Sequence, residues 1–272
     1  MAQVSQRLPA VAGLFYPADP HSLHAQVAGF LASAVPGEVV TAPKAVVVPH
    51  AGYIYSGAVA ASAYSELTRR RDVIRRVLIL CPTHRVYVRG MAVPASQSFV
   101  TPLGAVAVDR DAWLAASALP GVVVDDRPHA EEHAIEVQLP FLQSTLDHFT
   151  ILPIAVGDAE PQQVAAVLEA LWGGPETLIV ISSDLSHYHP YRQAQFRDKA
   201  TIAQIRQLDA TLDGEQACGA NAINGLLLAA RRHHLTPHLL DLRNSGDTAG
   251  DRSRVVGYAS IAFSDDSNHA HH

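Results

Sequence analysis

The chain has 272 residues, of which 48% are hydrophobic and 17% are charged, and its mean hydropathy is +0.09. This composition predicts one large globular α/β domain that buries enough apolar surface to fold without disulfide bonds. The formal net charge of −6 lacks the excess of basic residues typical of proteins that bind DNA or RNA. No apolar run approaches the roughly 20 residues that a membrane span requires. We therefore expect neither a nucleic-acid partner nor a membrane partner.

Cysteine content and the chain ends favour a cytoplasmic protein. The two cysteines, Cys81 and Cys218, are too few for a disulfide framework, which is typical of a reducing compartment. The first ten residues, MAQVSQRLPA, contain no apolar segment of the kind found in secretory signals. We expect residues 1–265 to form a single domain and residues 266–272 to be a disordered tail that contains histidines.

Apolar periodicity predicts helices that alternate with strands along the chain. Helical spacing predicts helices over 22–35, 57–67, 130–148 (bent near Pro140), 161–172, 191–208 and 215–233. Residues 92–109 alternate apolar and polar side chains, which predicts an antiparallel excursion at a sheet edge. Buried strands are expected at 150–156 and 255–263. The alternation predicts a three-layer αβα domain around a central mixed, mostly parallel sheet.

Three further apolar runs each end in a segment that contains histidine. They are 44–49, followed by His50; 77–81, followed by His84; and 178–181, followed by Asp184 and His187. Short Val/Ile/Leu runs of this kind are typical of strands buried on both faces of an α/β sheet. Ligand sites in such sheets open at the carboxyl ends of the strands. We therefore expect these four polar residues to meet at one edge of the sheet.

Imidazoles from two strand ends are suited to binding iron, zinc or copper, with a carboxylate or thiolate completing the ligand set. Asp184 is a candidate for the carboxylate, or it orients His187 through a ring N–H. His187 near a metal would serve as a general acid or base. Two structural alternatives stay open: His50 caps the following helix, and Asp184 is a helix N-cap.

A second cluster lies at His129, His133 and Glu136, whose spacing places them on one face of a helix. This face is a candidate metal site, a pocket wall or a solvated surface, and it lacks the HExxH pattern of zinc hydrolases. A third segment, 244–251, is rich in Gly and Asp and is interpreted as a plain turn. Cys218 is expected to lie buried in a helix.

Taken together, the motifs resemble those of the Memo family, whose prokaryotic members are called AmmeMemoRadiSam system protein B. The resemblance covers nearly the whole chain and runs, in order, through PAVAGLFYPAD, VVPHAGYIYSG, CPTHR, EEHAIEVQLPFL, SSDLSHY and SGDTAGDRSRVVGYAS. It implies a fold similar to class III extradiol dioxygenases, which hold a non-haem Fe(II) on two histidines and a glutamate. It further implies His50 and His84 as metal ligands.

The same resemblance implies that Asp184 and His187 share the metal pocket, and His133 matches a further histidine of the family pattern. We expect these three residues to be catalytic. Animal members of the Memo family complete their metal site with a cysteine shortly before the last strand. In this chain Thr248 stands at that position. The adjacent Asp247 is therefore the candidate third ligand. Fe(II) is the expected metal, with copper or zinc as alternatives, and no metal is expected if the third ligand is lost.

Two functions are compatible with this pattern. The first is a dioxygenase-like redox enzyme that acts on an unknown small substrate through a bound iron or copper ion. The second is a non-catalytic module that binds a peptide or protein and works with AMMECR1-domain and radical-SAM proteins, as the prokaryotic family name implies. An aromatic rim predicted to contact the ligand fits either function, and its members are Phe15, Tyr53, Tyr55 and Tyr188.

Overall fold

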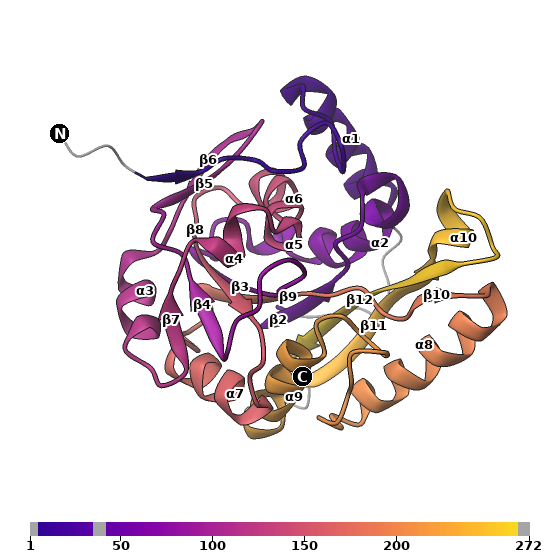
Figure 1. Ribbon diagram of the computed structural model, residues 1–272. Helices are drawn as coiled ribbons and strands as arrows, with labels where there is room; N and C mark the ends of the chain where they lie inside the picture. The colour runs from indigo at the N-terminus through magenta and orange to yellow at the C-terminus, as the bar shows by residue number, and fades with distance from the viewer. Residues whose placement is uncertain (1–4, 35–41, 266–272) are drawn as a thin grey trace, which may run out of the picture.

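The computed structural model describes residues 5–34 and 42–265 (Figure 1). The expected tail at 266–272, and the last position of the helix predicted over 22–35, lie outside the described residues. Within the described residues, no helix is long and apolar enough to cross a lipid bilayer.

A nine-stranded mixed sheet forms the centre of the molecule. Its strands lie in the order β10 (His187–His189), β12 (Val255–Ser264), β2 (Ala45–Val48), β9 (Thr177–Ser182), β3 (Arg76–Pro82), β8 (Thr150–Val156), β4 (Met91–Val93) and β7 (Val122–Val124), and β11 (Thr236–Asn244) also pairs with β12. The four strands β2, β9, β3 and β8 run parallel, while β12 and β4 flank them antiparallel. The three strands that precede the histidine segments are therefore direct neighbours.

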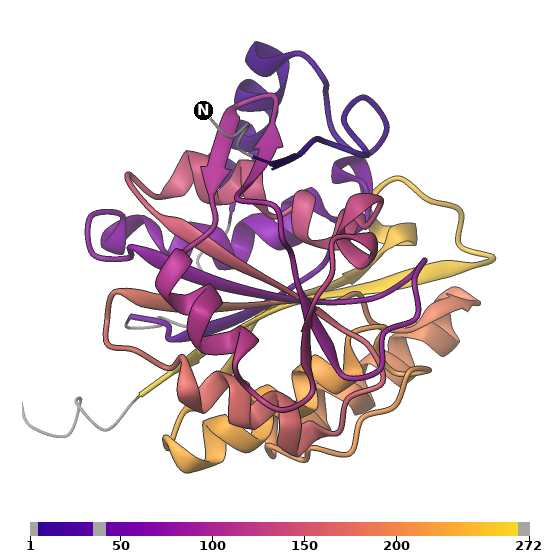
Figure 2. The same cartoon turned by 60° about the vertical axis from the view of Figure 1, so that its left-hand side comes forward.

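Helices cover both faces of this sheet, which confirms the three-layer α/β prediction (Figures 1 and 2). One apolar core is built from the sheet and from α1 (Pro20–Ser33), α2 (Tyr53–Glu66) and α6 (Leu139–Thr145). The other contains residues of α3 (Arg110–Ser117), α7 (Pro161–Ala170), α8 (Tyr191–Arg206) and α9 (Ala220–Arg232).

Alternation along the central strands explains why they are apolar throughout. In β2, Val46 and Val48 enter one core and Val47 enters the other, and all three are buried. Successive side chains of a strand point to opposite faces, so a strand covered by helices on both sides needs apolar residues at every position. This burial holds the carboxyl ends of β2, β9 and β3 in fixed register beside one another.

The segment predicted as an antiparallel excursion divides between two sheets. β5 (Ser98–Thr101) and β6 (Gly104–Ala107) form an antiparallel hairpin, as expected, and β1 (Gln6–Arg7) joins it in a separate three-stranded sheet. Strand β4, from the start of the same segment, pairs instead with β8 of the main sheet.

The single bent helix predicted over 130–148 is wrong. The structure has three short helices, α4 (Arg127–Ala130), α5 (His133–Glu136) and α6. The break has a local cause, because the side chain of Glu132 accepts a hydrogen bond from the backbone N–H of Ala134 and so begins a new helix. Pro140 lies in the first turn of α6, where its missing N–H costs no intrahelical hydrogen bond.

Two smaller expectations also require correction. The helix predicted over 215–233 begins only at Ala220, so Cys218 lies in the preceding turn and not in a helix. The segment interpreted as a plain turn contains the end of β11 and a one-turn helix, α10 (Ser245–Thr248), which Asn244 and Asp247 cap reciprocally.

Candidate metal centre

His50 is a buried imidazole placed at the carboxyl end of β2. Its side chain does not cap α2, which begins after Gly52 without a side-chain cap. The residue is 2% exposed, and its backbone N–H donates to Asp184 Oδ1 at 2.8 Å. Its Nδ1 lies 3.0 Å from Ser182 Oγ, at the end of the neighbouring strand β9. The parallel pairing of β2 with β9 thus brings these residues together.

The hydrogen bonds of Ser182 determine which nitrogen of His50 carries the proton. Ser182 Oγ donates its single proton to the carbonyl of Ala134 at 2.7 Å, and it accepts from Gln138 Nε2 at 2.9 Å. A hydroxyl has one proton and two lone pairs, so its remaining contact, with His50, must be accepted. The proton of His50 is therefore on Nδ1, and the Nε2 lone pair is free to bind a cation.

Glu132 contacts two other histidines of the site. Its carboxylate accepts from the backbone N–H of His84 at 2.9 Å and lies 3.0 Å from His84 Nδ1. It also lies 3.3 Å from Nδ1 of His133. Since an ionised carboxylate only accepts hydrogen bonds, Nδ1 of His84 is a donor, and in the neutral form of this ring Nε2 offers a lone pair.

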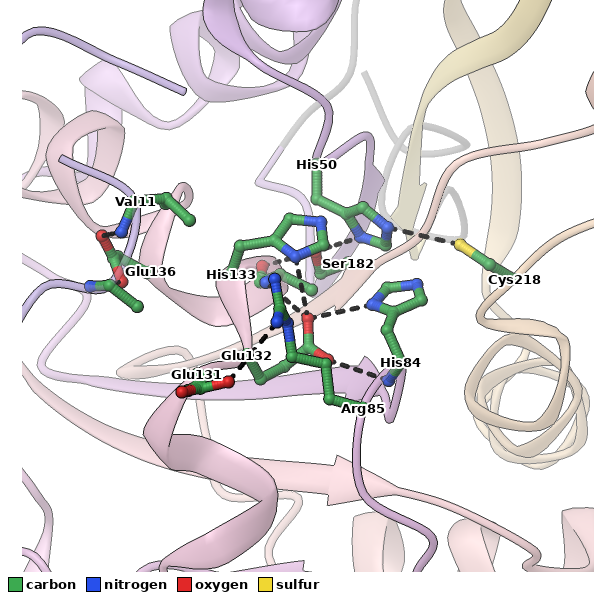
Figure 3. Close-up of polar contacts among 12 residues, drawn as sticks. Val11, His50, His84, Arg85, Glu131, Glu132, His133, Glu136, Ser182 and Cys218 are labelled. Atoms are coloured by element: carbon green, nitrogen blue, oxygen red, sulfur yellow. Dashed lines mark hydrogen bonds and ion pairs between the residues drawn. The ribbon is translucent and has the colours of Figure 1, made fainter. Parts of the chain in front are cut away.

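The three imidazoles converge on one point (Figure 3). A ring nitrogen from each of His50, His84 and His133 lies within 4.8 Å of the others, close enough for one ion to bind between them. The ring centroids are 5.1 to 5.3 Å apart, with His50 nearly perpendicular to the other two rings. Three converging imidazoles match the chemistry of zinc, copper and iron sites.

Burial keeps two of these rings neutral. Burial, and then the neighbouring His84, lowers the pKa of His50 to about 3, and burial, followed by the neighbouring His50, lowers the pKa of His133 to about 4. Burial also acts to lower the pKa of His84, but the hydrogen bond to Glu132 and the negative charges of Glu132 and Asp184 together outweigh burial and raise that pKa. Burial acts to raise the pKa of Glu132, but the hydrogen bonds from His84 and Ala134 and the charge of His84 together outweigh it and lower that pKa to about 2, so Glu132 stays ionised. A cation at this point would offset the buried negative charge of Glu132.

A pocket of 780 Å³ opens beside the three histidines. Asp184 and His187 both line it, as the strand order implies, and burial raises the pKa of the Asp184 carboxyl. Asp184 caps no helix, and His187 begins the short strand β10 rather than a helix. Phe15, Tyr55 and Tyr188 of the predicted aromatic rim also form its walls.

Two predicted site residues lie elsewhere. The carboxylate of Asp247 accepts hydrogen bonds from the backbone N–H of Asn244 and from the hydroxyl of Tyr191, and it does not line the pocket. The structure brings His133, not Asp247, to the two expected histidine ligands. Tyr53 is packed in the core, where its hydroxyl donates to the carbonyl of Val137 at 2.6 Å.

The second predicted cluster is dispersed, because the helix on which its spacing depended is broken. His133 faces the pocket, while His129 is buried with its Nε2 3.1 Å from the carbonyl of Ala92. Glu136 is buried in an ion pair with Arg7. The three residues therefore share no face.

Other residues of the site were missed by the sequence analysis. Arg85, Asp251, Arg254 and Tyr258 line the pocket, and Glu132, Ser182 and Cys218 contact the histidines from outside it. The segment EEHAIE could have indicated Glu132, because it places a carboxylate next to His133 and carboxylates commonly orient histidines that bind metals. No local pattern connects Cys218 with His50.

The family model for Memo-like proteins matches residues 7–262 of the chain. The chain belongs to the Memo family. It is 36% identical over 283 residues to a MEMO1 family protein of Sulfolobus acidocaldarius, covering 95% of this chain and 99% of that protein. MEMO1 family proteins of Methanopyrus kandleri and Aquifex aeolicus are 36% and 35% identical, and each alignment covers at least 94% of this chain and 98% of the relative. The Memo resemblance drawn from the motifs is confirmed.

Proposed function

We propose that this Memo family chain is a metal-dependent redox enzyme that acts on a small oxygen-bearing substrate. The observation that carries the proposal is the convergence of three imidazole rings, two of which, His50 and His84, are each held by a hydrogen bond at Nδ1. Fe(II) is the expected metal, with copper or zinc as alternatives. When bound, such an ion supplies Lewis acidity and, for iron or copper, redox chemistry.

The residues that surround the histidines would then bind the substrate and handle its protons. Asp184 and His187 line the same pocket, so a substrate hydroxyl in that pocket is within reach of both. Burial raises the pKa of Asp184, which favours its protonated form as a proton donor. Arg85 and Arg254 supply positive charge at the pocket wall, which favours a substrate with acidic or hydroxyl oxygens.

Anaerobic Fe(II) titration with elemental analysis tests the proposal. We expect the wild-type chain to take up about one ion, and the variants His50→Ala, His84→Ala and His133→Ala to lose it. The matched control is His148→Ala, which removes an exposed histidine. The double variant His50→Ala, His84→Ala keeps the C-terminal histidines and so measures any uptake by the tail. Equal uptake by the wild-type chain and this double variant would refute the proposal.

A specific feature of the surface favours a second function, the binding of an extended ligand such as a peptide. A groove of 620 Å³ adjoins the metal pocket and shares Val11, Phe15 and Arg85 with it. Its lining includes Leu8 and Leu14, which are 66% and 80% exposed. AMMECR1-domain and radical-SAM proteins are the proposed partners. Capture of these proteins by the His50→Ala, His84→Ala variant at the wild-type level would favour this function over catalysis.

A further inference from the structure

A pocket of 630 Å³ lies between α3 and the three-stranded sheet, on the face of that sheet that points away from the apolar core (Figure 1). Gln6, Ser98 and Ala107 occupy one rung across β1, β5 and β6, and all three line the pocket. The adjacent pair, Phe99 and Val106, is buried in the core. Because successive side chains of a strand alternate between faces, the short side chains of Ser98 and Ala107 form a flat floor.

Arg110 is the only charged residue among the described residues that line this pocket. Its guanidinium lies over the indole of Trp113, with Cζ 4.7 Å from the ring centroid, and the indole N–H donates to the carbonyl of Pro94 at 2.6 Å. Within the described part of the chain, Arg110 forms no hydrogen bond or ion pair. A guanidinium that lies on an aromatic ring keeps its N–H edge available for two parallel hydrogen bonds with a carboxylate.

The hydroxyl of Ser98 is a second group of this pocket without a partner. The residue is 7% exposed, and its Oγ is buried and has no hydrogen-bond partner among the residues that the structure describes. Most buried polar side-chain atoms in folded proteins have such a partner. A change of the Ser98 rotamer turns the hydroxyl toward a ligand on the floor, where an acceptor on that ligand would supply the missing hydrogen bond.

We propose that this pocket binds a small flat carboxylic acid, such as a benzoate, with the carboxylate on Arg110 and the ring against the floor of the sheet. One guanidinium compensates the single negative charge of a carboxylate, whereas a phosphate monoester carries about two charges at neutral pH. The volume lies within the range of about 300–1,000 Å³ typical of small-molecule sites. The pocket shares no lining residue with the metal pocket, so the inference goes beyond the proposed redox function and does not depend on it.

Quenching of Trp113 fluorescence by 4-nitrobenzoate is the test. Trp113 and Trp172 are the two tryptophans of the chain, so all indole emission of the full-length, metal-free Trp172→Phe variant comes from the pocket. We expect saturable quenching in this parent variant, because a nitroaromatic ring in contact with an indole quenches its emission. Adding Arg110→Gln should weaken binding about 10- to 100-fold, as expected for lost hydrogen bonds to a charged group. The matched control, Arg192→Gln, changes an exposed arginine in the first turn of α8 and should bind as the parent does.

Two further comparisons complete the test. The uncharged 4-nitrobenzamide should bind more weakly than 4-nitrobenzoate by the same factor, and Ala107→Leu, which enlarges an exposed side chain of the floor, should abolish saturable quenching. Calorimetric titration of the wild-type chain with 4-nitrobenzoate guards against misfolding of Trp172→Phe.

Quenching that does not saturate together with no binding heat in the wild-type chain, or equal affinity for the acid and the amide, would overturn the inference. Binding should persist in the His50→Ala, His84→Ala variant. Its loss there would place the acid at the histidines and would also overturn the inference, while a failure of metal uptake alone would leave it intact.

Discussion

Arg7 and Glu136 form a fully buried ion pair that ties the N-terminal segment to the short helix that carries His133. The guanidinium of Arg7 also donates to the backbone carbonyls of His129 and Glu132, at 3.0 and 2.6 Å. Glu136 in turn accepts from the backbone N–H groups of Ala10 and Val11. The pair therefore fixes the backbone on both sides of Glu132, whose carboxylate contacts His84 and His133 of the candidate metal centre.

Glu136→Gln should strongly destabilise the fold. The change leaves the guanidinium of Arg7 buried without a counter-charge, and the loss of one partner of a buried ion pair costs about 3–5 kcal/mol. Urea unfolding of the metal-free protein measures this cost. The matched control is Glu131→Gln, whose carboxylate is exposed beside the exposed Arg85, and we expect it to cost at most about 1 kcal/mol. A Glu136→Gln variant as stable as this control would contradict the role assigned to the pair.

Glu132→Gln should weaken metal binding about 10- to 100-fold. The amide has one oxygen where the carboxylate has two acceptors, and both are used by His84, so His84 loses a hydrogen bond and His133 loses its charged neighbour. Competition titration with Zn(II) and a chromophoric chelator measures the affinity, with Glu131→Gln again as the control. Wild-type affinity in Glu132→Gln would show that the rings are oriented by packing alone.

Much of the architecture follows from patterns that lie within short segments. The apolar runs before His50, His84 and Asp184 predict strands buried on both faces, and parallel neighbours bring their carboxyl ends to one edge. The resemblance in sequence motifs then supplied the family. These patterns do not predict the positions of residues that are held by tertiary contacts, because such contacts produce no periodic pattern in the local sequence.

The segment around His133 illustrates this limit. The i, i+4, i+7 spacing of His129, His133 and Glu136 is typical of one helix face, yet the side chain of Glu132 interrupts the helix and directs each residue to a different partner. Cys218 is a second example, since it lies 168 positions from His50 in sequence and reaches it only through the turn before α9. The contact of His133 with His50 and His84, and that of Cys218 with His50, could therefore be found only from the structure.

Ser182→Ala should allow His50 to carry its proton on either ring nitrogen. The variant removes the oxygen that accepts from Nδ1, so the Nε2–H tautomer gains population and competes with metal binding. Nitrogen-15 chemical shifts of the imidazole report the tautomer, and Zn(II) titration should show about tenfold weaker binding. Ser117→Ala, which removes an exposed hydroxyl on α3, is the control. Unchanged imidazole shifts in Ser182→Ala would rule out the serine as the determinant.

His129 should make the fold sensitive to acid. Its ring is buried against Phe99, with Nε2 near the carbonyl of Ala92 and with Nδ1 lacking a hydrogen-bond partner, and burial lowers its pKa to about 4. In the unfolded chain this histidine has its ordinary pKa of about 6.5, so it takes up a proton there first as the pH falls. The contribution of His129 to the free energy of unfolding is therefore lost between about pH 6.5 and 4. Between pH 7 and pH 5, the proton uptake of this residue lowers the free energy of unfolding by about 2 kcal/mol.

His129→Gln removes this proton uptake while its amide keeps a donor for the carbonyl of Ala92. We expect the difference between the unfolding free energies at pH 7 and pH 5, measured in urea without metal, to be about 2 kcal/mol smaller than in the wild-type chain. His50 and His133 are also buried with lowered pKa values and contribute equally in both proteins, so the comparison isolates His129. The control variant His148→Gln alters an exposed ring and should leave the difference unchanged. The same pH dependence in His129→Gln and the wild-type chain would mean that the buried ring is not the acid-sensitive group.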